Sequence, residues 1–207
     1  MARVYPQAQP HQLAQASPSS PTSSTTLQRE VFTIWMKSLV LNGNGCAVYD
    51  SGGRLAYRVD NYGCRRGEEA FLMDSGGRVL FRIRRTKNLL MLGGWEGYKY
   101  SASQQEEPAP SFRAKKKQPK IFSGDEACQV TVVNADGRCY RIEGLVCKPA
   151  YKITDVVGEV VAEVKRKQTA SGVILGEDVL TLVAEPNSDL SLVMALVVLC
   201  GMMGHSM

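Results

Sequence analysis

The hydrophobic positions of this chain fall in short runs separated by turns that contain aspartate or asparagine and glycine. Four such turns join apolar runs, within residues 48–54, 72–78, 133–138 and 153–159. This order predicts a β-hairpin, because the turn needs a positive φ angle that glycine adopts at little cost. The turns fall into two pairs, so the pattern predicts two similar halves, each a β-meander.

Inside these runs, large apolar residues alternate with polar ones. On one predicted strand Val79, Phe81 and Ile83 share a face, and Arg82 and Arg84 share the other. Because successive side chains of a strand point to opposite faces, the alternation predicts antiparallel strands with one buried and one solvent-exposed face. Further strands are expected at residues 31–40, 89–92, 95–100, 121–122 and 128–133, and onward to residue 183.

The last apolar segment has no such alternation. Residues 190–203 are apolar nearly all round, and the preceding Pro-Asn-Ser-Asp at 186–189 supplies residues that cap a helix. A helix without a polar face must be buried. The segment is shorter than the ~20 residues that a membrane span needs, so a core helix is favoured over an anchor. The pattern predicts a mainly β fold with its sheet wrapped around a C-terminal helix.

Composition adds a domain boundary. Residues 1–27 are rich in Ser, Pro and Gln and predict a disordered tail. An organelle transit peptide is the alternative, although such peptides are usually Arg-rich and amphipathic. Residues 28–207 then form a single domain, with a flexible loop near 101–119 that includes a short strand around Phe112. The net charge of +5 permits contact with anionic lipid or nucleic acid without requiring either.

Residue types suited to catalysis or metal binding are sparse. The histidines are His11, in the tail, and His205, near the end, so His-dependent triads and His-ligated metals lack their central residue. The six cysteines lack C-x-x-C spacing, which indicates reduced, buried residues of an intracellular protein, with a disulfide framework or a zinc site as the minor alternative. We expect no catalytic residues, no metal and no cofactor. The acids considered for a paired-carboxylate site, and interpreted as surface charge, are Glu143, Asp155, Glu159 and Asp178.

Basic clusters are the strongest functional signal in the sequence. If two clusters converge, their field would hold an anionic leaflet or phosphorylated headgroup at ~1 kcal/mol per charge. Alternatively, the cations simply deter sheet-to-sheet aggregation. Aromatic residues near them are few, so direct nucleic-acid binding is not expected. A further basic run lies in the loop at 115–120. The candidate lipid-contact residues are Arg82, Arg84, Arg85 and Lys87 in one cluster, and Lys165, Arg166 and Lys167 in another.

Five blocks of residues carry a resemblance to a known family. They are residues 32–38 (FTIWMKS), 57–62 (YRVDNY), 71–74 (FLMD), 162–168 (AEVKRKQ) and 172–178 (GVILGED). In this order they resemble the plant LURP-one-related family, from about residue 31 to residue 199. That family is similar to Tubby C-terminal domains and phospholipid scramblases. The resemblance implies a closed antiparallel barrel of about twelve strands around a central C-terminal helix, and a link to pathogen defence.

The resulting expectation is a non-enzymatic Tubby-like module, a monomeric signalling or scaffold protein that binds phosphoinositide or anionic membrane surfaces. It would be cytoplasmic and peripheral at the plasma membrane, with the nucleus left open. The sequence shows no clear match to the headgroup-binding motif of Tubby proteins, so no binding residue is carried over. Two alternatives stay open: a protein–protein scaffold without lipid binding, and a scramblase-like protein whose terminal helix enters the bilayer.

Overall fold

The computed structural model describes residues 28–36, 45–60, 68–86, 94–116, 128–132, 137–143 and 150–203. These residues form twelve strands and one helix. The elements are β1 (Glu30–Trp35), β2 (Gly45–Tyr49), β3 (Leu55–Asp60), β4 (Glu69–Asp74), β5 (Val79–Arg85), β6 (Gly94–Lys99), β7 (Phe112–Lys116), β8 (Cys128–Val132), β9 (Cys139–Glu143), β10 (Tyr151–Asp155), β11 (Val160–Arg166), β12 (Val179–Ala184) and α1 (Leu190–Met203).

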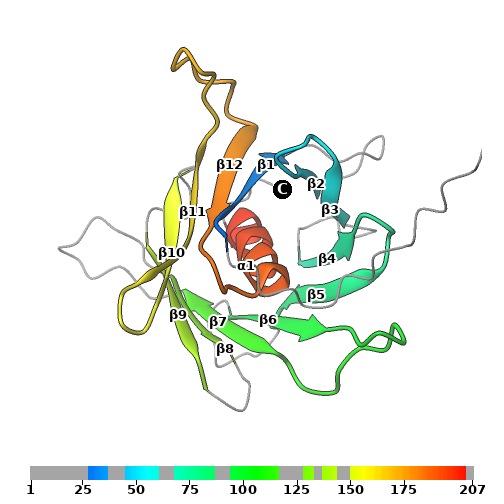
Figure 1. Cartoon of the computed structure of the whole chain (residues 1–207). Helices are drawn as coiled ribbons and strands as arrows, with labels where there is room; N and C mark the ends of the chain where they lie inside the picture. The colour runs from blue at the N-terminus through cyan, green and yellow to red at the C-terminus, as the bar shows by residue number, and fades with distance from the viewer. Residues whose placement is uncertain are drawn as a thin grey trace, which may run out of the picture.

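The strands form one antiparallel sheet that follows the order of the chain. Each strand pairs with the next, and β1 pairs with both β2 and β12, which joins the ends of the sheet into a closed ring. Figure 1 looks into this ring and shows α1 inside it. Because each of the twelve described strands has two neighbours, none of them is an edge strand with a row of unpaired backbone groups.

The helix α1 begins at a capped end and fills the ring with apolar side chains. The Asp189 carboxylate accepts a hydrogen bond from the Leu192 backbone N–H at 3.1 Å, which satisfies one of the unpaired donors of the first turn. Every residue from 192 to 203 is buried. Their neighbours are the inward side chains of the strands, among them Ile34, Leu72 and Ile83, each with no exposed surface. The core of this protein therefore lies between the helix and the inner face of the sheet.

The turns that join the strands repeat one local structure. In the first, the Asp50 side chain accepts hydrogen bonds from the backbone N–H groups of Gly52 and Arg54 at 2.8 and 2.9 Å. The Arg78 backbone N–H bonds to Asp74 in the same way at 2.9 Å. In each turn the arginine guanidinium also contacts that aspartate. The glycines after these aspartates have positive φ angles, 75° at Gly53 and 82° at Gly77. The repeated sequence pattern is thus a repeated turn geometry.

Gly53 offers a direct test of this explanation. A Cβ atom added there would meet nothing within 4 Å, so only its φ of 75° opposes a side chain. We expect Gly53→Ala to lower the free energy of unfolding by about 1 kcal/mol, because an L-residue is strained in this region. Gly53→Asn should cost less, since asparagine tolerates the left-handed conformation better. Urea denaturation of the three proteins measures both values. Equal costs for alanine and asparagine would contradict the φ explanation.

The predicted elements agree with the observed ones at several places. The mainly β, antiparallel prediction with a C-terminal helix is confirmed, and the helix has the predicted bounds of 190–203. The short strand expected around Phe112 is β7, and the strand predicted at 31–40 is described to Trp35 as β1. The tail and the strands predicted at 89–92 and 121–122 lie outside the described residues.

Candidate functional site

The outward side chains of β5 include Arg82 and Arg84 of the first predicted basic cluster. The inward alternates, Phe81 and Ile83, are buried against the core, which turns Arg82 and Arg84 to the outer face. Arg82 forms an ion pair with Glu69 of β4 and another with Glu106 in the loop before β7, the latter at 3.1 Å. This arginine is therefore enclosed between two carboxylates.

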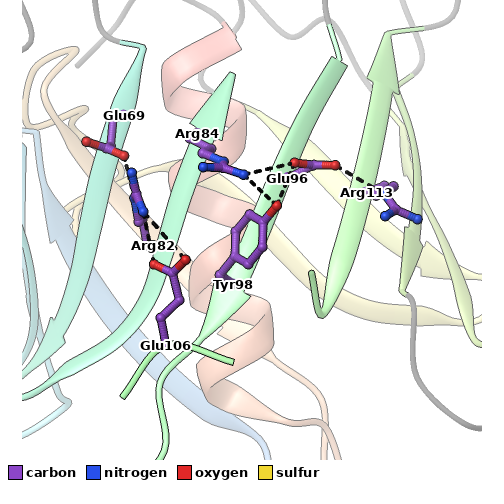
Figure 2. A network of polar contacts seen from close by, with 7 residues as sticks. All are labelled: Glu69, Arg82, Arg84, Glu96, Tyr98, Glu106 and Arg113. Carbon is purple, nitrogen blue, oxygen red and sulfur yellow. Dashed lines mark hydrogen bonds and ion pairs between the residues drawn. The ribbon is translucent and has the colours of Figure 1, made fainter. Parts of the chain in front are cut away.

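Arg84 belongs to a second part of the same polar network (Figure 2). Its guanidinium lies over the Tyr98 ring, 4.5 Å from the centroid, and donates a hydrogen bond to the Tyr98 hydroxyl at 2.7 Å. That hydroxyl donates to Glu96 at 2.8 Å, and Arg113 of β7 donates to the same carboxylate at 3.2 Å. Although desolvation alone would raise it, the bonds from Tyr98 and Arg113 hold the pKa of Glu96 below its usual value.

The carboxylates of this network were missed by the sequence analysis. They are Glu69, Glu96 and Glu106, and they face Arg82, Arg84 and Arg113, so acids and bases balance. In the sheet, Glu69 and Glu96 lie directly opposite Arg84 on the neighbouring strands. The register shift between Leu72 and Met73 displaces the β4–β5 pairing by one residue, so counting from the turn would have placed Glu68 there instead. This network of three arginines and three glutamates is consequently neutral as a whole, and its field at a distance is small.

The second predicted cluster lies on and just after β11. Lys165 contacts Glu163 at 3.5 Å, and Arg166 contacts Glu177 at 3.2 Å. Lys167 donates a hydrogen bond to the Thr33 hydroxyl of β1. The Glu177 side chain is 85% exposed, so water and salt screen its attraction to Arg166 strongly. These cations are less tightly held than the arginines of β5.

The two clusters do not meet. In the ring, six steps separate β5 from β11 in either direction, which puts them on opposite walls. Arg85 is exposed at the end of β5, and Lys87 lies outside the described residues. Lys115 lies on β7, on the β5 side of the ring, while the rest of the 115–120 run is described only in part. A single site that combines the β5 and β11 cations is therefore excluded by the geometry.

The inner face of the ring carries a few polar side chains of its own. Burial, with a smaller effect of the nearby Asp60 charge, raises the pKa of the Cys46 thiol to about 12. Burial and a hydrogen bond with Cys200 raise the pKa of the Tyr151 hydroxyl well above its ordinary value. Both groups therefore stay protonated at neutral pH, which makes Cys46 a poor nucleophile. Cys46 and Cys200 are buried free thiols, as expected for cysteines that act as small hydrophobic residues, whereas Cys139 is a free thiol that is only partly buried.

Two further features bear on the candidate chemistry. Across the described residues, the structure contains no group of three or more His, Cys, Asp or Glu side chains placed to hold a metal ion. His11 and His205 both lie outside that part of the chain. Within the same ranges, no helix has the length and apolar character required to cross a bilayer.

By its fold, this protein is a closed antiparallel β-barrel with a C-terminal helix buried inside it, and its outer face carries a polar network. The chain belongs to the LURP-one-related family, whose model matches residues 30–201. The resemblance found in the sequence is thereby confirmed.

Particular relatives come from Arabidopsis thaliana. Protein LURP-one-related 4 is 41% identical over 204 residues, which cover 98% of this chain and 86% of that protein. Protein LURP-one-related 11 is 40% identical over 179 residues, or 83% of this chain and 76% of the relative. An X-ray structure of another Arabidopsis protein superimposes with a TM-score of 0.57 at 18% identity, covering 85% of this chain and 91% of that one. The structural likeness supports the fold alone.

Proposed function

We propose that this chain is a non-enzymatic, Tubby-like module that works through the outer surface of its barrel, as a peripheral membrane adaptor in plant signalling. The observation that carries this proposal is the position of α1. Its residues 192–203 are buried inside the ring and occupy the interior in which a barrel of this kind would otherwise hold a substrate. Ligands and partners would then contact the wall.

The β11 wall is the better candidate for contact with an anionic membrane. On the β5 wall, Arg82 and Arg84 are engaged by partly buried carboxylates. On the β11 wall, the partners of Lys165 and Arg166 are more exposed to water, so these cations exchange partners at lower cost. Basic residues near an anionic leaflet contribute about 1 kcal/mol each. Because acids offset part of this charge, we infer modest headgroup selectivity rather than tight phosphoinositide recognition.

Charge reversal on each wall tests this assignment. Arg85 and Lys167 make no ion pair within the described part of the chain, which makes them a matched pair. We expect Lys167→Glu to weaken binding to vesicles that contain phosphatidylserine or phosphoinositide by about 30-fold, because the reversal changes the charge by two units at roughly 1 kcal/mol each. Arg85→Glu, on the opposite wall, should bind like the wild type. Co-sedimentation of the full chain across a salt series measures both.

Two results would contradict the anionic-membrane part of the proposal. One is equal binding to neutral and anionic vesicles at every salt concentration. The other is the same loss for Arg85→Glu as for Lys167→Glu, which would mean that net charge alone matters. A protein scaffold without lipid contact predicts instead that both variants keep their protein partners and that no vesicle binds. A scramblase-like mode requires α1 to leave the ring, which would expose the side chains that now form the core.

A further inference from the structure

The hairpin between β11 and β12 exposes a group of aliphatic side chains. It comprises residues 167–178 and projects from the ring at the top of Figure 1. Val173, Ile174 and Leu175 are 61%, 48% and 45% exposed. Every residue from 168 to 176 is uncharged. Three adjacent exposed aliphatic residues on a projecting arm are costly in water, which indicates a surface that contacts something apolar.

Polar groups of this hairpin are largely paired with one another. The backbone N–H of Thr169 donates to the Val173 carbonyl at 2.9 Å, and that of Leu175 donates to the Lys167 carbonyl at 3.0 Å. The hydroxyls of Thr169 and Ser171 share a hydrogen bond of 2.8 Å. The Val173 N–H donates to the Thr169 hydroxyl at 3.1 Å. Moving polar groups out of water costs much less when they are already hydrogen-bonded, so this arm is suited to an apolar medium.

The arrangement of the aliphatic residues favours lipid over a protein partner. Adjacent residues of an extended arm point to opposite faces. Because Val173, Ile174 and Leu175 are all exposed, both faces of the arm are apolar. A protein partner docked on one side would leave the other face in water, whereas lipid surrounds a projecting arm. The aliphatic group therefore fits a bilayer interface better than a docking surface.

The base of the hairpin has the composition of a membrane-interface region. Trp35, 43% exposed, pairs with Val179 at the start of β12, and the Met36 N–H donates to the Asp178 carbonyl at 2.8 Å. Tryptophan and long basic side chains favour the headgroup level, because their apolar part contacts lipid there while their polar end stays in water. The cations there are Lys165, Arg166 and Lys167, and the acids among them are Glu163, Glu177 and Asp178.

We propose that the hairpin of residues 167–178 inserts its aliphatic side chains into the interface of a lipid bilayer, with Trp35 and the β11 cations at the headgroup level. This inference rests on the proposed peripheral membrane function and names the contact that it uses. The acids at the base offset the cations, so the driving force is apolar burial. Binding through this hairpin should therefore persist where electrostatic attraction is screened.

The test uses vesicles of phosphatidylcholine alone in about 1 M salt, where the Debye length is about 3 Å. The full wild-type chain should co-sediment with them. Val173→Ser/Ile174→Ser/Leu175→Ser should partition roughly 30-fold more weakly, because three partly exposed aliphatic side chains no longer gain from burial. The matched control is Val156→Ser/Val157→Ser. These valines, 69% and 80% exposed, lie in the turn at the other end of β11, and the control should bind like the wild type.

A depth measurement gives an independent readout. In Ile174→Trp the added indole should be quenched by brominated phosphatidylcholine, whereas in Val157→Trp it should not. Circular dichroism and thermal melting establish that each variant is folded. Failure of the wild type to bind phosphatidylcholine vesicles, equal binding by the triple-serine variant, or an equal loss in the control would each overturn the inference.

The outcomes separate this inference from the proposed function. Binding only to anionic vesicles, abolished by salt and unaffected by the triple-serine variant, supports headgroup attraction and rejects insertion. Salt-resistant binding to phosphatidylcholine that is lost in the triple-serine variant supports insertion, even if Lys167→Glu has no effect. Binding of a protein partner through the hairpin, with no vesicle bound, rejects insertion.

Discussion

Leu199→Ala is expected to lower the free energy of unfolding by about 3 kcal/mol, which is a large fraction of the total free energy of unfolding of a typical domain. Leu199 lies on α1 and has no exposed surface. Truncation there removes the transfer free energy of the side chain and leaves a cavity between the helix and the strands, which the ring of hydrogen-bonded strands resists closing. Urea denaturation followed by circular dichroism measures the change.

The control for this prediction is the same substitution at an exposed site. Leu175, 45% exposed in the hairpin between β11 and β12, should tolerate alanine with a change of about 0.5 kcal/mol or less. A similar, small cost at both leucines would mean that α1 is not packed inside the ring. The non-catalytic proposal would then lose its main support, because the interior would have room for a ligand.

Gly97→Ala is the second substitution with a large expected effect on the free energy of unfolding. We expect this free energy to fall, although the same change usually raises it in a strand. Alanine normally suits the interior of a strand better than glycine, by roughly 0.5–1 kcal/mol. At Gly97, however, an added Cβ atom would lie 2.1 and 2.2 Å from two carbons of the Phe112 ring. Phe112 is fully buried on β7, directly opposite Gly97. Because the buried Phe112 side chain is packed on all sides, we expect the clash to outweigh the strand preference for alanine. The free energy of unfolding should then fall by about 3 kcal/mol.

A double-mutant cycle identifies the cause. Phe112→Leu removes the edge of the ring that the new methyl group would meet, so Gly97→Ala should cost less in that background than in the wild type. The difference between the two costs is the coupling between the residues. An equal cost in both backgrounds would show that the loss at Gly97 comes from the backbone and not from the contact with Phe112.

The barrel wall shows why basic residues in the sequence were an incomplete guide to function. Arg82 and Arg84 looked like part of an exposed basic cluster, because their alternation with Phe81 and Ile83 put them on the outer face. That placement is confirmed, yet both arginines contact acids from other strands. The hairpin at residues 167–178 shows the opposite. Residues 172–178 belong to a block that carries the family resemblance, but the exposure of their aliphatic side chains is visible only in the folded chain.

Features that depend on neighbours along the chain could be predicted from the sequence. The turns after Asp50 and Asp74 and the start of α1 at Asp189 follow from local hydrogen bonding and from the φ angles that glycine permits. Alternation likewise assigned Phe81 and Arg82 to opposite faces, because the strand period is two wherever the strand lies. These are short-range effects, and they act before any tertiary contact exists.

The contacts between distant residues could not be predicted in this way, because they depend on how the strands are arranged in the ring. The partners of Arg82 come from β4 and from the loop before β7, and Lys167 reaches Thr33 of β1 across β12. The separation of the two basic clusters follows from the order of strands around the ring. Charge–charge interactions depend on distance in space and on burial, and sequence separation specifies neither. The outer surface to which we assign the proposed function therefore forms only when the strands close into the ring.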